Sequence, residues 1–176
     1  MSYDNPGMKR FALCGIGLAF AGSLFAQENK ALANELVKHW ETSKQLSLEV
    51  AEAMPAGDYN FKATPAEMSF GAQMNHIAAA DGNYCSAAIG TKSPLGKLTD
   101  DSKEAAIKNL TTAYDYCIDG IKEMNDADLL KPVSFHGQST TKFALFWGGF
   151  THSAHHRGQA EVYLRLKGIT PPEYKF

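Results

Sequence analysis

The stretch IKNLTTAYDYCIDGIKEM, residues 107–124, carries the clearest structural pattern in the chain. Its apolar residues recur at alternating steps of three and four, at Ile107, Leu110, Tyr114, Cys117, Ile121 and Met124. This heptad pattern is typical of a helix that buries one seam against its neighbours in a bundle. It predicts a helix from about Ser102 to Met124.

Three further segments predict helices around this one. A stripe of apolar and small residues at helical spacing predicts a helix over 28–54, which a proline and a glycine then end. A second helix is expected over 64–89, because Thr64-Pro65-Ala66-Glu67 has the pattern of a capping box with proline at the first helical position. The last helix is expected over 141–167, ending at Gly168.

The segment 125–140 interrupts the helical pattern. It lacks helical periodicity and contains Pro132 and Gly137, so we expect an irregular connection across one end of the bundle. We find no strand-period segment of useful length and no internal repeat. Four long helices in a domain of about 150 residues predict an all-α four-helix bundle.

Composition and charge exclude several functions. The chain has 176 residues, 44% of them hydrophobic, as expected of a globular domain. Its 17 Lys and Arg against 19 Asp and Glu give a net charge of −2, so no nucleic-acid partner is expected. The three cysteines form no Cys-x-x-Cys pair, which excludes a zinc ribbon and a thioredoxin-like dithiol.

The N-terminal residues 1–26 resemble a secretory signal peptide. The basic pair Lys9-Arg10 precedes the uncharged run 11–25, and Ala26 is a suitable residue before a cleavage site. The run is shorter than the ~20 residues that span a bilayer. We therefore expect an exported protein, periplasmic or secreted, with a mature domain over 27–176 and no stable membrane span after cleavage. The alternative is an uncleaved membrane anchor.

Two histidines on the last predicted helix are candidate metal ligands. His152 and His156 are four residues apart, so both imidazoles project to one side of a helix, one turn apart. The same geometry places them on the inner face of the bundle and places the charge ladder Arg157, Glu161 and Arg165 on the outer face. His155 competes with them, either as a ligand or as an interface or outer-shell residue.

His76 is the natural third ligand. Small residues surround it on the second predicted helix and would let a neighbouring helix come close, as would Gly148-Gly149 on the last helix. Small side chains around the histidines would leave space for an ion and its solvent. The alternative for His76 is a core histidine bonded to a backbone carbonyl. His39 and His136 are expected at the surface, although His136 could reach the mouth of the bundle as an acid or base.

Cys85 and Cys117 are not expected to bind a metal. Cys85 is nine residues from His76, half a helical rotation away, so it should point away from any metal. Cys117 belongs to the core seam of its helix. A disulfide between Cys85 and Cys117 is permitted in an oxidising compartment, but nothing in their spacing requires it.

Several motifs together resemble one known family. In chain order they are AMPAGDYNFKATP at 53–65, SFG at 69–71, NHI at 75–77, HSAHHRGQA at 152–160, YLRLKGI at 163–169 and the proline pair at 171–172. In content and order they are similar to the DinB/YfiT-like metalloenzyme superfamily, and the resemblance covers residues 28–172. It implies a bundle of up-down-down-up order with a long crossover between the second and third helices. It also implies one divalent metal held by His76, His152 and His156.

A neutral three-histidine site favours zinc or nickel, because imidazole is a borderline ligand. Family members of known activity are mainly thiol-dependent transferases or isomerases, which implies a metal-dependent S-transferase as one candidate. Export favours instead a metal-dependent hydrolase that uses a metal-bound water and an unidentified small-molecule substrate. A non-catalytic metal-binding or stress-response module is the third candidate.

A homodimer is also expected, because relatives commonly pair by packing helices side by side. Val37 and Leu48 lie off the main apolar stripe of the first helix, and Phe143 and Phe146 begin the last. These residues could form an exposed apolar patch beside the bundle, leaving the metal site open. Alternatively, they cover the ends of the bundle.

Overall fold

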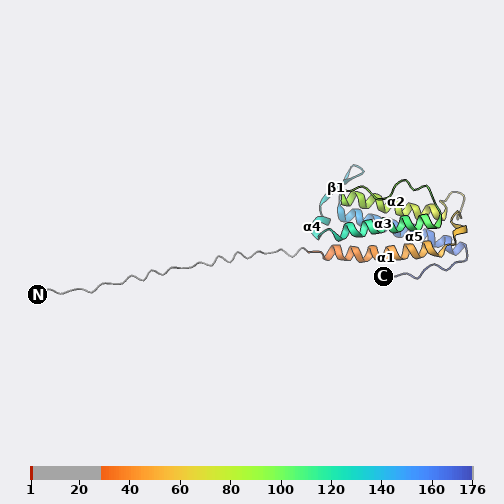
Figure 1. The fold of residues 1–176 in the computed structure, drawn as a ribbon, viewed down its shortest axis with the longest axis horizontal. Coiled ribbons are helices and arrows are strands. Elements are labelled where there is room, and N and C mark those ends of the chain that lie inside the picture. Colours follow the sequence, from red (N-terminus) through yellow and green to blue (C-terminus); the bar gives the residue numbers. More distant parts are fainter. Residues whose placement is uncertain (2–28, 176) are drawn as a thin grey trace.

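Four long helices form the protein in this computed structural model, which describes residue 1 and residues 29–175 (Figure 1). The long helices are α1 (Ala31–Ala53), α2 (Phe70–Ile89), α3 (Lys103–Lys122) and α5 (Lys142–Leu166). Shorter elements lie between them: the 3-10 helix Ala56–Asp58, α4 (Asp126–Leu129), β1 (Pro132–Phe135) and β2 (Gln138–Thr141). The expected four-helix bundle is confirmed.

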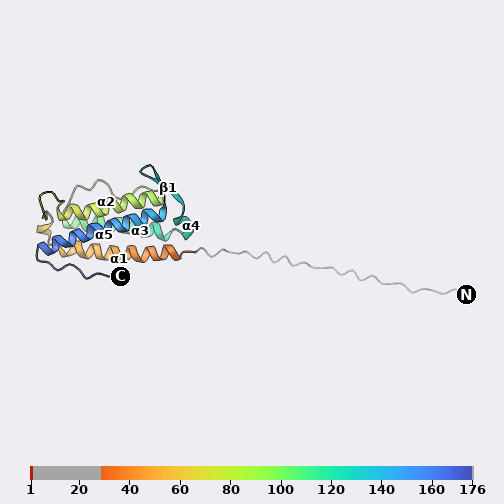
Figure 2. The ribbon, with the colours of Figure 1, turned by 180° about the vertical axis from the view of Figure 1, so that it is seen from behind.

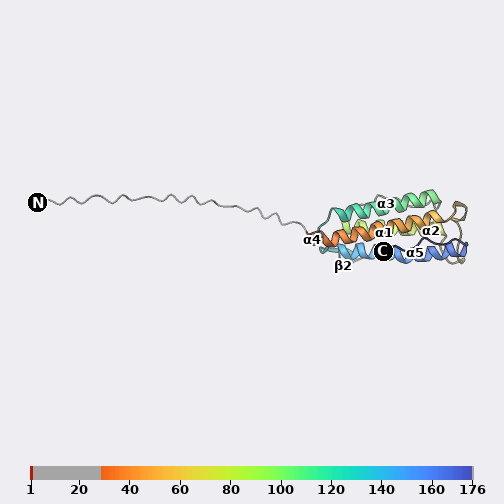
Figure 3. The same cartoon turned by 90° about the horizontal axis from the view of Figure 1, so that it is seen from below.

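The helices follow the expected up-down-down-up order (Figures 1 and 2). Helix α1 packs against α3 and α5, and α2 packs against α3 and α5, so the consecutive helices α1 and α2 lie diagonally across the bundle (Figure 3). Helices α2 and α3 are parallel, and segment 90–102 returns along the bundle to connect them. This crossover passes so close to α2 that a Cβ atom on Gly71 would lie 2.1 Å from the Asp101 carbonyl oxygen.

The core lies along the seams that the four long helices turn toward each other. Trp40 is completely buried and meets Tyr114 edge-on, with ring centroids 5.7 Å apart. Cys85 and Cys117 are also buried and form a disulfide between α2 and α3, with Cα atoms 5.4 Å apart. The structure thus contains the pairing that the spacing left open.

Helix α2 begins later than the capping-box pattern predicted. Residues 64–67 form a turn in which the Glu67 amide donates to the Thr64 carbonyl at 3.1 Å. Ser69 caps the helix instead, accepting from the Ala72 amide at 3.2 Å. The turn brings the chain back on itself, so that the carbonyls of residues 59 and 61 satisfy the first two helical amides.

Segment 125–140 is not irregular, and the expectation that the chain contains no strands was wrong. It holds α4 and an antiparallel hairpin in which Pro132 pairs with Thr141 and Phe135 with Gln138. His136 and Gly137 form its two-residue loop with φ of 49° and 77°. Two consecutive positive φ angles match a type I′ turn, which suits the twist of a hairpin.

The inner face of α5 also differs from the prediction. Its buried seam runs through Phe146, Gly149, Ser153, Arg157, Ala160 and Leu164. Arg157, expected in an outer charge ladder, is only 7% exposed and donates from Nη1 to Ser43 Oγ at 3.0 Å. Of that ladder, only the pair Glu161–Arg165 forms, at 3.6 Å.

The predicted signal peptide, residues 1–26, lies outside the described residues, apart from residue 1. Within the described part of the chain, no helix has both the length and the apolar character needed to cross a membrane.

Candidate metal centre

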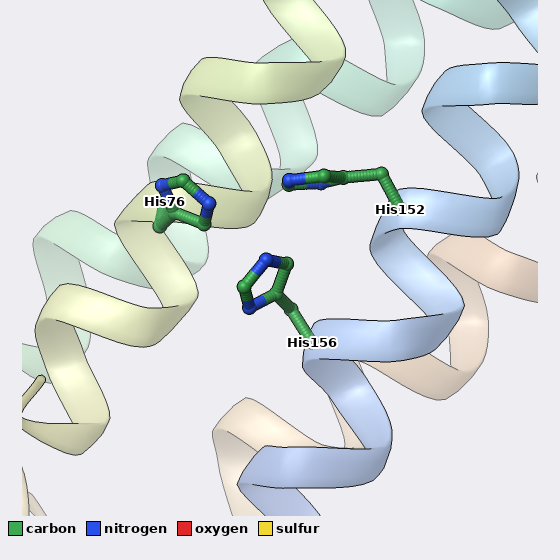
Figure 4. A group of neighbouring side chains, drawn as sticks. All are labelled: His76, His152 and His156. Carbon is green, nitrogen blue, oxygen red and sulfur yellow. The ribbon is translucent and has the colours of Figure 1, made fainter. Parts of the chain in front are cut away.

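Three histidines meet between α2 and α5. His76 lies on α2, and His152 and His156 lie one turn apart on α5, with the three rings turned toward one another (Figure 4). One ring nitrogen from each residue lies within 4.8 Å of the others. The ring centroids are 5.0 Å apart for His76 and His152 and 4.4 Å apart for the other two pairs. The structure therefore brings together all three residues that the sequence singled out.

The site lies beside the core rather than on its innermost face. All three histidines are partly exposed, because the buried seam of α5 passes through Ser153 and Arg157 instead. Gly148 lets Tyr84 of α2 lie close to α5 one turn before the site, because a Cβ on Gly148 would be 3.2 Å from the Tyr84 ring. The Tyr84 and His152 ring centroids are 6.2 Å apart, so this tyrosine borders the site.

Two glutamines orient His156. Gln159 Oε1 lies 3.1 Å from His156 Nδ1 and accepts from Gln73 Nε2 at 2.6 Å. Gln73 is nearly completely buried, so its amide is fixed between the helices. His156 Nδ1 also lies 3.0 Å from Gln73 Nε2, so it either accepts from Gln73 or donates to Gln159 Oε1. When Nδ1 donates to Gln159, the other ring nitrogen of His156 keeps its lone pair for a ligand.

Burial lowers the proton affinity of two of these rings. The pKa of His156 is lowered to about 4, mainly by burial and then by the neighbouring His152, His76 and His155. Burial, followed by charge repulsion from His76 and His155, also lowers the pKa of His152. Both imidazoles are therefore neutral near pH 7, which is the form that binds a metal ion.

The group fits a metal ion by its donor chemistry and by one unsatisfied atom. The buried Nδ1 of His152 has no hydrogen-bond partner among the described residues. A buried polar atom without a partner is an uncompensated cost that a bound ion or its solvent would remove. Three imidazole ligands suit a late first-row divalent metal. The three histidines could hold such an ion.

The other candidates lie outside this group. His155 is exposed and accepts a hydrogen bond at Nε2 from Gln159 Nε2 at 3.0 Å, consistent with the outer-shell alternative. His136 is exposed at the hairpin loop, where its ring packs on Phe135 at 4.2 Å. His39 is half-buried against Phe150, and Cys85 is held in the disulfide.

Sequence reasoning did not identify Gln73 as part of the site. It precedes His76 by three residues, so the two share a helix face. Its contact with His156, however, depends on which turn of α5 lies opposite. A long polar residue at i−3 from a candidate ligand is the signal that was available.

Gln159→Ala is expected to weaken metal binding without abolishing it. The variant removes the acceptor that fixes the His156 ring, and loss of such an outer partner typically costs about 10–100-fold in metal affinity. Competition against a chromophoric chelator measures the change. Gln45→Ala, on the exposed side of α1, provides the matched control and should leave the affinity unchanged. An unchanged affinity in Gln159→Ala would contradict the orienting role.

Fold and site together define a class: up-down-down-up four-helix bundles with a histidine triad between the second and last long helices. The DinB family model matches residues 26–176, so the chain belongs to the DinB family. Among curated proteins, none matches the chain.

Two solved structures share the fold. The chain is 18% identical to a DinB-like protein from Bacillus cereus ATCC 10987, covering 81% of this chain and 97% of that one, with a TM-score of 0.70. It is 22% identical to a DinB-like protein, YjoA, from Bacillus subtilis, covering 80% and 96%, with a TM-score of 0.68. At these identities the likeness shows the fold alone.

Proposed function

We propose that this protein is an exported, metal-dependent hydrolase acting on a small-molecule substrate, with His76, His152 and His156 as ligands of one zinc or nickel ion. The observation that carries the proposal is the histidine triad, whose nitrogens lie within 4.8 Å of one another at a partly exposed position. When bound there, a divalent ion supplies Lewis-acid activation of water. The Gln73–Gln159 pair fixes the orientation of the His156 ring, and the exposed side of the triad admits substrate.

Export is supported by two features. The first 26 residues have the pattern of a signal peptide. The disulfide between Cys85 and Cys117 is a bond that persists mainly in oxidising compartments. Low-molecular-weight thiols are chiefly cytosolic, which favours hydrolysis over the alternative, thiol S-transfer.

A cobalt-substituted protein distinguishes the candidate functions. Addition of a low-molecular-weight thiol should leave its absorption spectrum unchanged, and the zinc- or nickel-loaded protein should hydrolyse an activated ester faster than His152→Ala does. An intense new absorption band on thiol addition would instead favour the S-transferase. Ester turnover equal to that of His152→Ala, without a thiol band, would favour the non-catalytic module.

We also propose a homodimer that pairs through the first turns of α5. Phe143 and Trp147 stack with ring centroids 6.3 Å apart, and Trp147 is 46% exposed. Phe146, expected in the same patch, is completely buried and cannot take part. Val37 and Leu48 cannot take part either, because they lie on the side of α1 on which Glu41 and Lys44 pair with α3. A dimer through this face leaves the histidines on the α2 side uncovered.

Light scattering over a dilution series should give the mass of a dimer for the protein and of a monomer for Phe143→Glu, because a charge in an apolar interface is costly. His136→Glu, at the exposed hairpin loop, is the control and should remain dimeric. A monomer mass for the unmodified protein at every concentration would remove the dimer.

A further inference from the structure

A cavity of about 200 Å³ lies on the opposite side of α5 from the histidines. It opens between α1 and α5 and is covered in part by Tyr174 and Lys175 of the C-terminal tail, which runs back along these helices (Figure 3). Arg157 and Ser43 form part of its lining. Its size is below the roughly 300–1,000 Å³ typical of pockets for drug-sized ligands, so it suits a smaller molecule.

The buried arginine in this cavity has unused donors. Toward the described residues, Arg157 donates from Nη1 alone, to Ser43 Oγ at 3.0 Å and to Ser47 Oγ at 3.5 Å. Its other guanidinium nitrogens have no partner among the described residues, and none is sealed from solvent. A guanidinium has five N–H donors, so several are without a partner among the described residues, and Arg157 lines the cavity.

Within the described part of the chain, the charge of Arg157 also has no close counter-charge. No Asp or Glu is among the described residues that line the cavity, and no described carboxylate lies within 4.0 Å of the guanidinium. Asp81 attracts Arg157 through the core, but burial raises the pKa of this carboxyl well above its usual range, which favours its neutral form. A buried cation without a close partner is costly, and a bound anion would reduce that cost.

The remaining walls indicate what kind of anion would fit. Trp147 and Phe150 form an apolar side, with ring centroids 5.5 Å apart. Thr42 adds a hydroxyl, and Lys175, which pairs with Glu49, adds a second positive charge at the rim. A planar carboxylate accepts two parallel hydrogen bonds from a guanidinium, whereas the aromatic rings favour an apolar body.

We infer that this cavity is a binding site for a small organic carboxylate with an apolar or aromatic body. The carboxylate contacts the free N–H groups of Arg157, with Thr42 and Lys175 beside it, and the body lies against Trp147 and Phe150. This site is separate from the histidine triad and does not depend on the metal.

Benzoate is the probe, titrated into the metal-free full-length protein and followed by broadening of its proton NMR signals. Saturable binding is expected, with benzyl alcohol and inorganic phosphate each binding at least about tenfold more weakly, since one lacks the charge and the other the apolar body. Binding should persist in His152→Ala. Loss of binding in His152→Ala, or equal binding of either analogue, would overturn the proposal, as would no saturable binding.

Two cavity variants leave Arg157 in place, because its replacement could unfold the core. Thr42→Phe fills the cavity and should abolish benzoate binding. Lys175→Glu should weaken it about tenfold, whereas Lys38→Glu, which changes the net charge equally on an exposed part of α1, should change it less than about twofold. Equal effects of the two charge reversals, or full binding in Thr42→Phe, would place the ligand elsewhere and overturn the inference.

Discussion

His152→Ala should reduce the affinity for zinc or nickel by more than about a hundredfold, since loss of a direct ligand should exceed the roughly 10–100-fold cost of losing an outer partner. His152 contributes one of only three nitrogens at the site, and no described carboxylate or thiol joins this group to replace it. Titration against a chromophoric chelator gives the affinity, and circular dichroism verifies the fold.

His155→Ala is the matched control for this experiment. It removes an imidazole from the same helix, but His155 is exposed and lies outside the group of three whose nitrogens converge, although its ring is 4.9 Å from that of His156. Its metal affinity should therefore stay within about threefold of the unmodified protein, well below the cost expected of a ligand. Equal losses in the two variants would mean that His152 is not the partner of His156.

Reduction of the Cys85–Cys117 disulfide should lower the free energy of unfolding by roughly 3–4 kcal/mol. The bond closes a loop with a sequence separation of 32 residues, and opening it restores conformational entropy to the unfolded chain. For a domain of this size, the expected fall in melting temperature is about 6–16 °C. Thermal unfolding with and without a reductant measures it.

Oxidised and reduced samples are matched, because they differ only in the sulfur–sulfur bond. Both samples are the mature domain, residues 27–176, which lacks the third cysteine, Cys14, and with it any exchange of partners. Two free thiols in the oxidised sample, or identical melting temperatures, would contradict the presence of the disulfide.

The sequence predicts α3 well and the buried face of α5 poorly, for one physical reason. The seam of α3 is entirely apolar and contains Leu110, Tyr114 and Ile121, which mark a buried stripe directly. The seam of α5 contains Gly149, Ser153, Arg157 and Ala160, whose burial depends on what the opposite helix offers. Ser43 and Ser47 of α1 accept from Arg157, and no periodicity within α5 could reveal those partners.

The candidate site shows the same division. The helical spacing predicted that His152 and His156 share a side, and the small residues around His76 made it the candidate third ligand. The family resemblance then implied all three as ligands of one metal. The contact of Gln73 with His156 was not predictable from the sequence. The two residues are 83 positions apart, and the contact depends on which turn of α5 packs opposite Gln73 of α2. The hairpin at 132–141 was missed since its strands have only four residues each and too short a pattern to recognise.

The diagonal placement of α1 and α2 has a consequence for biosynthesis. A nascent chain that ends before α3 lacks both helices against which α1 packs, so the apolar face around Leu36 and Trp40 has no partner. Domains built on such non-local contacts complete their cores late. The N-terminal half should therefore remain uncompacted during translation, and a truncated product ending near residue 100 should be degraded by cellular proteases or bound by chaperones.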